Sequence, residues 1–402
     1  MALDDTNILR TIEDPKMNDE LFTIDEINED VVEDELVKIT VIGVGGGGGN
    51  MVNHMIKEGT SKISLIAANT DAQALKASLA PTVLQLGAKL TRGLGAGMKP
   101  EKGFKAAEES YEEIKESLVG SDLVFIATGL GGGTGTGASS VIARAAQEVG
   151  ALTIAVCTKP FSFEGPKRSK LAIKGYEDLK SECNSMVVIP NDKLLMAIDK
   201  NMGYAESFSM VDDVLAKAVT GICSIVLTAG TVGINTDFAD LQTVMDHKGL
   251  ALMGMGFGSG TTAANDAIRE AIESPLLEDV SIKGAMGVLV HFQFNANYSL
   301  VAINEAMNII YDSIDEDADV IFGTTIDDSL AEDEVKTTLI ATGFEKEAGA
   351  KEANNIAEKT VEQVEKNVRI VRQNLQKAVG DYEFNENEDY LDIPTFLRQQ
   401  MD

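Results

Sequence analysis

Short apolar runs alternate with longer stretches of helical periodicity along the first half of the chain. The runs are rich in β-branched residues and almost continuously apolar, which is typical of parallel strands buried on both faces. Strands are predicted at 37–43, 63–69, 83–86, 123–128, 152–158 and 185–190, with helices that include 100–118 and 134–149. Regular strand–helix alternation predicts a Rossmann-like α/β domain built on a parallel sheet.

The pattern changes after a long proline-free helix predicted at 205–227. Beyond it, strands are predicted at 251–256, 287–294, 319–325 and 335–341, and helices at 264–274 and 300–312. These elements predict a second, smaller α/β domain. We therefore divide the ordered chain into a first domain at 37–204, a central helix at 205–230 and a second domain at 231–344.

Both ends of the chain differ in character from the two domains. Residues 1–36 carry thirteen acidic side chains, and a segment with so much charge and so little apolar surface is predicted to be disordered. Residues 345–388 form a linker in which alanine and valine recur at heptad-like spacing over 357–378. This stripe predicts an amphipathic helix that docks on its own domain or on a partner. A short tail at 389–402 follows.

The net charge of −30 limits the possible partners. So acidic a surface repels phosphate backbones, which argues against DNA or RNA. A nucleotide would have to be held by backbone N–H groups and a metal ion, because lysine and arginine are scarce. No run approaches ~18 apolar residues, so no membrane-spanning helix and no direct membrane insertion is predicted. The three cysteines lie far apart and form no metal motif, which indicates a reducing cytoplasm.

A run of glycines follows the first predicted strand. In Gly43-Val44-Gly45-Gly46-Gly47-Gly48-Gly49-Asn50 the chain turns from strand to helix, which directs several N–H groups at an anion. The spacing of Gly43, Gly45 and Gly48 also satisfies the dinucleotide fingerprint. An NAD-dependent oxidoreductase therefore stays open, although that class needs an acidic residue where the next strand ends in Asn69-Thr70-Asp71. The chain contains no GxxxxGK[ST] loop.

A second glycine loop indicates which kind of ligand the first loop binds. Residues 129–137 read GLGGGTGTG, and they also connect a predicted strand to a predicted helix. If the two loops were only tight turns, each would need one or two glycines, and the other glycines would be unexplained. Two such loops on one sheet predict a ligand with several phosphates, held from two sides.

Several segments of the chain resemble the tubulin/FtsZ family of GTPases. GGGTGTG is similar to the tubulin signature, and GGGGGN, NTDAQAL, GLGAG, TKPF-x-FEG, IPNDKLL and DFAD follow in the order of that family. The resemblance covers 37–343. It implies binding of GTP and GDP, with Mg²⁺, and GTP hydrolysis coupled to head-to-tail self-assembly at the bacterial division site. A tubulin-like relative that forms filaments outside division remains an alternative.

The resemblance also implies a set of nucleotide-binding residues. Ala96 and Gly97 would approach the terminal phosphate, Phe208 would stack on guanine, and Asp212 or Asp213 would accept its N–H groups. On its own, Phe208 is more simply a core aromatic. The full set comprises the residues Gly46, Gly47, Gly48, Gly49, Asn50, Asn69, Asp71, Ala96, Gly97, Gly133, Thr134, Gly135, Thr158, Glu164, Arg168, Asn191, Phe208, Asp212 and Asp213.

Two carboxylates follow the long predicted helix. Asp237 and Asp240 are three residues apart and would share one face of a helix. By spacing alone they are an N-cap and a first-turn acid. The resemblance implies instead that this loop, with Asn235, enters the pocket of the next subunit and polarises the attacking water. No dedicated metal-ligand set is predicted.

The end of the chain resembles the tail peptide of the same family. The residues concerned are Asp392, Ile393, Pro394, Phe396 and Leu397. By resemblance this peptide binds membrane tethers and other division proteins.

Overall fold

The structure is a computed structural model that describes residues 37–60, 62–197, 202–227, 237–247, 249–274 and 282–344. The predictions for the acidic segment 1–36, the stripe at 357–378 and the tail at 389–402 lie outside the described residues. Asn235 lies outside them as well.

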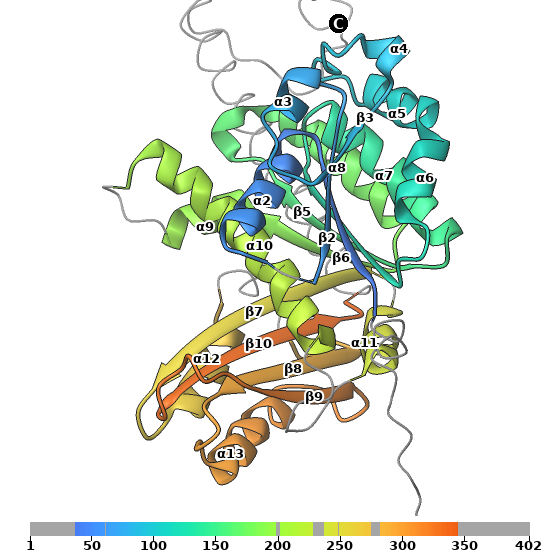
Figure 1. The fold of residues 1–402 in the computed structure, drawn as a ribbon. Helices are drawn as coiled ribbons and strands as arrows, with labels where there is room; N and C mark the ends of the chain where they lie inside the picture. The colour runs from blue at the N-terminus through green and yellow to red at the C-terminus, as the bar shows by residue number, and fades with distance from the viewer. Residues whose placement is uncertain are drawn as a thin grey trace, which may run out of the picture. The chain divides into compact units, whose positions relative to one another are not determined.

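The described strands form one sheet of ten strands, and the chain is a mixed α/β protein (Figure 1). The strand order is β3-β2-β1-β4-β5-β6-β7-β10-β8-β9. The first seven are parallel, β10 is antiparallel to both its neighbours, and β8 pairs parallel with β9. The strands are β1 (Ile39–Val44), β2 (Ser64–Asn69), β3 (Thr82–Gln85), β4 (Leu123–Gly129), β5 (Leu152–Lys159), β6 (Ser185–Pro190), β7 (Gly249–Ser259), β8 (Gly287–Phe294), β9 (Asp319–Ile326) and β10 (Glu334–Thr342).

The helices of the described residues connect these strands. They are α2 (Gly45–Lys57), α3 (Ala72–Lys76), α4 (Ala88–Thr91), α5 (Pro100–Glu109), α6 (Tyr111–Leu118), α7 (Thr134–Glu148), α8 (Pro166–Lys180), α9 (Asn191–Ala197), α10 (Tyr204–Leu227), α11 (Phe238–Met245), α12 (Ala263–Ile272) and α13 (Leu300–Tyr311). None of them is both long enough and apolar enough to cross a membrane.

The prediction of one continuous helix at 100–118 was wrong, because the helix breaks at Ser110. The Ser110 hydroxyl accepts a hydrogen bond from Gly87 N at 3.1 Å and donates one to Gln85 O at 3.4 Å. These bonds hold Ser110 at φ −103° and ψ 20°, outside helical geometry. A contact with a distant turn causes the break.

The parallel strands β1, β2, β4, β5 and β6 are covered on both faces. Alternate residues such as Ile42 and Ile126 belong to a buried cluster with residues of α5, α6, α7 and α8. The intervening residues, such as Val41 and Phe125, are equally buried, and α2 and α10 contact the strands there. The near-continuous apolar runs in the sequence therefore reflect a two-sided burial.

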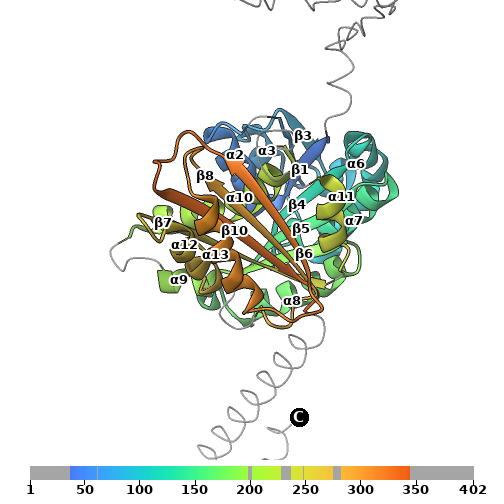
Figure 2. The same cartoon turned by 90° about the horizontal axis from the view of Figure 1, so that it is seen from below.

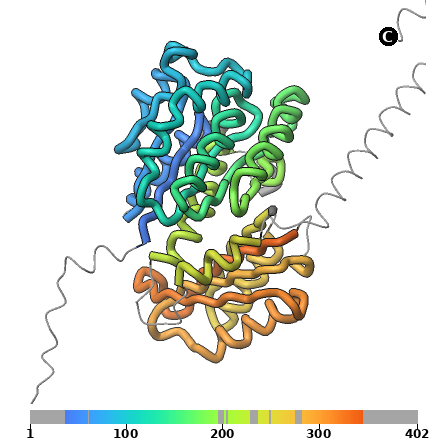
Figure 3. The backbone as a smooth tube through the Cα atoms, turned by 90° about the vertical axis from the view of Figure 1, so that its right-hand side faces the viewer, coloured from blue at the N-terminus to red at the C-terminus, as the bar shows by residue number. Residues whose placement is uncertain are grey.

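The last four strands have their own core with α12 and α13 (Figure 2). The close approach of α12 to β7 requires glycine, since a Cβ at Gly256 would lie 1.9 Å from Ala267 O. Leu250, at the start of β7, packs against both cores. The α10 segment connects the two groups of elements along the chain (Figure 3). The proposed domain boundaries at 204, 230 and 344 stay a prediction.

Candidate functional site

The two glycine loops lie where the strand order of the sheet reverses. From β1 the chain proceeds outward to β2 and β3, and it then returns to β4 on the other side of β1. Such a switch point leaves a crevice at the carboxyl ends of the two central strands, which is where open α/β sheets bind ligands. One glycine loop follows β1 and the other follows β4.

Two helix N-termini meet at this crevice. Neither α2 nor α7 has a side-chain cap, so their first N–H groups lack that means of pairing. The two turns are in contact, because a Cβ at Gly45 would lie 2.9 Å from Gly135 N. Two positive helix ends at one place, neither of them capped by a side chain, form a binding site for anions.

The glycines of the first loop have different structural roles. A Cβ at Gly48 would lie 2.1 Å from Ala127 O, one at Gly43 would lie 2.3 Å from Gly48 O, and Gly45 has a left-handed φ of +74°. These are the three glycines of the dinucleotide fingerprint. Their spacing therefore indicates how closely α2 packs against the sheet. By contrast, a Cβ at Gly46 or Gly49 would meet no atom within 4 Å. Gly46 and Gly49 therefore leave open space at the helix N-terminus.

The second loop is tightly packed within the protein. A Cβ at Gly135 would lie 2.5 Å from Thr128 Oγ1 and 2.7 Å from Gly129 O. The buried Thr136 hydroxyl accepts a hydrogen bond from Gly131 N at 2.8 Å, so it stabilises the loop. The Thr134 hydroxyl lies 2.6 Å from that of Thr70.

A third loop, at 92–99, lies against the second. Lys102 Nζ donates to Gly95 O at 2.9 Å, and a Cβ at Gly133 would lie 2.8 Å from Ala96 Cβ. Gly97 is exposed and has a φ of +60°. The structure thus brings Ala96 and Gly97 to the same edge as the two glycine loops.

Three of the predicted binding residues also hold the backbone of this edge. Asn69 Oδ1 accepts from Asp71 N at 3.2 Å, and Asp71 Oδ1 accepts from Gln73 N at 2.8 Å as the N-cap of α3. Thr158 is buried, and its carbonyl accepts from Leu130 N at 2.9 Å. The Asp71 carboxylate therefore caps a helix where a dehydrogenase would bind a ribose.

Glu164 and Arg168 form an ion pair beside the second glycine loop. Arg168 Nη1 lies 2.8 Å from Glu164 Oε2, and the other oxygen of Glu164 accepts from Phe161 N at 2.9 Å. A Cβ at Gly131 would lie 2.8 Å from Arg168 Cγ. This contact places the Arg168 side chain at the crevice.

An aromatic cluster borders the same edge. Phe208, on α10, packs edge-to-face on Phe161 with ring centroids 5.4 Å apart, and Phe161 stacks on Phe163 at 5.0 Å. The sequence did not single out Phe161 and Phe163, although the FSFEG segment in which they lie carries the resemblance. Asn191, the first residue of α9 directly after β6, is 7% exposed, and its Oδ1 has no hydrogen-bond partner.

The neighbouring carboxylates Asp212 and Asp213 lie in different environments. Burial raises the pKa of Asp212 to about 6. Asp213 contacts the Lys217 ammonium, with Nζ at 2.7 Å, and the His54 imidazole, with Nε2 at 3.5 Å.

Comparisons with known proteins agree with this geometry. Residues 38–199 match the model of the Tubulin/FtsZ family, GTPase domain, and residues 249–345 match that of the FtsZ family, C-terminal domain. The cell division protein FtsZ of Helicobacter pylori (strain ATCC 700392 / 26695) is 45% identical over 366 residues, which are 91% of this chain and 93% of the relative. The chain belongs to the tubulin/FtsZ family.

Solved structures of the family have the same fold. The FtsZ dimer of M. jannaschii is 42% identical, with a TM-score of 0.72 over 78% of this chain and 90% of that one. CetZ2 from Haloferax volcanii, at 19% identity and a TM-score of 0.68 over 82% of this chain and all (100%) of that one, shares the fold. As a member of the tubulin/FtsZ family, the chain is a GTPase, and nothing favours the oxidoreductase interpretation.

The two carboxylates of the FtsZ-family DFAD segment form a capping box on α11. Asp240 N donates to Asp237 Oδ1 at 2.8 Å, and Asp237 N donates to Asp240 Oδ2 at 3.1 Å. Asp246, at the other end of α11, accepts from Asn184 Nδ2 at 3.1 Å, and Asn184 directly precedes β6. The α11 helix therefore lies by the amino ends of the parallel strands, away from the glycine loops.

Proposed function

We propose that this chain binds GTP at the carboxyl edge of its sheet and assembles head to tail with its own copies. GTP is then hydrolysed where one subunit meets the next. Membership of the tubulin/FtsZ family supports the GTPase activity and the self-assembly, and the relative from Helicobacter pylori is a cell division protein. We infer the same process for this chain.

One observation supports hydrolysis between subunits most strongly. The glycine loops lie at the carboxyl ends of the parallel strands, whereas the Asp237/Asp240 pair lies on α11, by their amino ends. From Phe208 to Leu227, α10 alone extends about 29 Å at 1.5 Å per residue. A head-to-tail contact brings opposite ends of two molecules together and continues into a filament. In such a contact the carboxylates of one subunit meet the phosphates of the next and orient the attacking water, a role that phosphoryl transfer requires.

The residues at the crevice fit a guanine nucleotide. Uncapped N-termini of α2 and α7 supply N–H groups for phosphate oxygens, and the open space at Gly46 and Gly49 lets them approach. Phe208 supplies a ring for the base, and Asn191 Oδ1 is an acceptor that still needs a donor.

Mg²⁺ fits this site only in combination with the phosphates. Asp71 caps α3 and Glu164 pairs with Arg168, so these two carboxylates of the crevice are already engaged. The ion would be held mainly by phosphate oxygens and water, as is common for Mg²⁺ at nucleotide sites. Its chemical contribution is to neutralise charge on the transferred phosphoryl group.

The cellular location and the partners of the chain belong to the same proposal. We infer that the chain acts in the cytoplasm at the division site. The tail residues Asp392, Ile393, Pro394, Phe396 and Leu397 would bind membrane tethers and other division proteins. A filament protein outside division is less well supported, because both this tail peptide and the Asp237/Asp240 pair are present.

Nucleotide specificity of assembly tests the proposed function. The full chain is incubated with Mg²⁺ and GTP, ATP or NAD⁺, and polymer is collected by sedimentation. We expect pelleted protein and released phosphate with GTP alone, and no pellet with GDP. Polymer that forms equally with ATP, or saturable NAD⁺ binding at the site, would contradict the proposal.

A further inference from the structure

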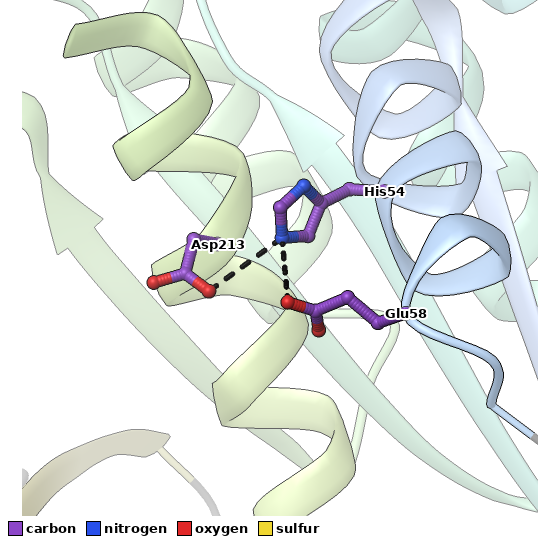
Figure 4. A group of neighbouring side chains, drawn as sticks. All are labelled: His54, Glu58 and Asp213. Atoms are coloured by element: carbon purple, nitrogen blue, oxygen red, sulfur yellow. Dashed lines mark ion pairs between the residues drawn. The ribbon is translucent and has the colours of Figure 1, made fainter. Parts of the chain in front are cut away.

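Three side chains with metal-binding atoms converge on the outer side of the α2–α10 contact (Figure 4). His54 and Glu58 come from the end of α2, and Asp213 comes from α10. His54 Nε2 lies 3.3 Å from Glu58 Oε1 and 3.5 Å from Asp213 Oδ1. Elsewhere among the residues that the structure describes, no other group of three such ligands meets in this way.

The convergence leaves a buried polar nitrogen without a hydrogen bond. His54 Nε2 is buried and makes no hydrogen bond. Its distances to the two carboxylate oxygens exceed the ~2.9 Å at which N–H···O bonds are usual. A proton on Nε2 would join the three side chains as an ion pair, whereas a neutral imidazole protonated on its other nitrogen offers a lone pair, with the two carboxylates, to a cation between them.

We propose that His54, Glu58 and Asp213 form a binding site for a divalent transition-metal ion such as Zn²⁺. One imidazole nitrogen and two carboxylate oxygens are ligands that Zn²⁺ accepts. For metal–ligand distances near 2.0–2.1 Å, the ligands of a tetrahedral site lie about 3.3 Å apart. The two nitrogen–oxygen distances in the cluster match that edge length, and water would supply the fourth ligand.

The chemistry of the cluster selects the class of ion. Mg²⁺ and Ca²⁺ prefer sites made of oxygen ligands, whereas imidazole favours zinc and its neighbours in the first transition row. His54 and Glu58 are spaced i, i+4, which places both side chains on one face of α2. The ligands therefore need only one further helix, α10, to complete the set.

Lys217 orients the third ligand. Its Nζ lies 2.7 Å from Asp213 Oδ2, the oxygen that does not point to His54. Outer partners of this kind fix the direction of metal-binding carboxylates. The Glu58 side chain is 49% exposed, against 21% for His54, so an ion can enter from solvent beside Glu58.

A bound ion would connect the two helices that border the nucleotide crevice. The α2 helix begins at the first glycine loop, and α10 carries Phe208. The ion would hold these helices together at a point outside the phosphate loops. The inference does not depend on the proposed function, because metal binding itself is measured.

Zn²⁺ titration calorimetry on the metal-stripped full chain tests the site. We expect one saturable site in the wild type and at least a tenfold loss of affinity in His54→Gln, with a smaller loss in Glu58→Gln. His247→Gln is the matched control. The His247 side chain is 23% exposed and lies 3.3 Å from Asp319 Oδ2, but it faces that single carboxylate. Its substitution should leave the site unchanged.

Two further measurements keep the test independent of folding. Zn²⁺ should raise the melting temperature of the wild type and of His247→Gln, but not that of His54→Gln, because an ion that binds only the folded state stabilises it. Co²⁺ should give the intense visible absorption of a tetrahedral site in the wild type but not in His54→Gln. Equal Zn²⁺ affinity in wild type and His54→Gln, or no saturable site in either, would overturn the proposal.

Discussion

Individual glycines in the two loops are needed for different physical reasons. The sequence shows a run of five, and nothing in the run distinguishes one position from another. The structure separates Gly46 and Gly49, which face open space, from Gly45 and Gly48, which touch neighbouring backbone. Substitutions at these positions should therefore have different effects on binding and on folding.

Gly46→Val should weaken GTP binding without unfolding the protein. The added side chain meets no protein atom within 4 Å at its Cβ, but it occupies the space in front of the α2 N-terminus where phosphate would lie. We expect at least a tenfold loss of GTP affinity, about 1.4 kcal/mol. Calorimetry measures it, and denaturant unfolding should show nearly wild-type stability. Unchanged affinity would mean that the phosphates lie elsewhere.

Gly135→Val should have the opposite balance. Its Cβ would lie 2.5 Å from Thr128 Oγ1 and 2.7 Å from Gly129 O, so the second loop must shift. These close contacts are with the protein itself, and the φ of Gly135 is not positive. Overpacking of this kind costs about 1–3 kcal/mol. Chemical denaturation measures this loss. A free energy of unfolding equal to that of the wild type would contradict the prediction.

Asp212 and Asp213 should respond oppositely to loss of charge. Burial raises the pKa of Asp212 to about 6, so between about pH 4 and 6 the folded state binds more protons than the unfolded state. The free energy of unfolding therefore falls as pH rises through that range. Asp212→Asn should be more stable than the wild type at pH 7, and the difference should vanish near pH 4.

The matched variant Asp213→Asn should be less stable than the wild type at pH 7. It removes the ion pair with Lys217 at 2.7 Å. Thermal unfolding across pH 4–7 compares the two variants. A stabilising Asp213→Asn together with a destabilising Asp212→Asn would reverse the assignment of their environments.

At the scale of elements, strands were easier to predict than helix limits. Each run predicted as a strand forms one, because burial on both faces leaves a continuous apolar signature. The break at Ser110 depends on bonds to residues near position 87, and no local signal marks it. The start of α8 could have been found, since Pro166 follows Gly165 and proline is favoured at the first helical position.

A substitution on α11 tests whether its capping carboxylates also have a catalytic role. Asp240→Ala should cost about 1 kcal/mol of stability, because one half of the capping box is lost. GTP affinity should stay the same, since the pocket of the same chain lies at the other edge. Turnover in the assembled state should fall ~10²-fold, as expected for a lost water-positioning group.

The control for this experiment is Asp266→Ala on α12. Asp266 is also a first-turn acid, and it accepts from Thr262 Oγ1 at 2.7 Å. Its loss should lower stability by a similar amount and leave the turnover in the polymer unchanged. Equal turnover in both variants would mean that Asp240 has only its capping role.

At the scale of the whole molecule, the sequence indicated the class of ligand better than the arrangement of the site. Two glycine loops after strands were sufficient to predict several phosphates. Their meeting at one switch point depends on the pairing of β1 with β4 across a long stretch of chain. The contact of His54 with Asp213 also depends on how α10 packs on α2. Neither contact leaves a periodic signal in the sequence.

The edge-to-edge separation of the glycine loops and the Asp237/Asp240 pair has one further consequence. A monomer would bind GTP but lack the groups that orient water, so catalysis would require a second subunit. Catalysis should therefore depend on protein concentration, because assembly alone brings the two edges together.

The most direct test measures GTP turnover per chain against protein concentration, with sedimentation of the same samples. We predict almost no turnover at low concentration, where GTP is bound but no polymer pellets. Turnover per chain should then rise at the concentration at which polymer first appears. A turnover per chain that stays constant down to dilute monomer would show that a single chain contains the whole catalytic site.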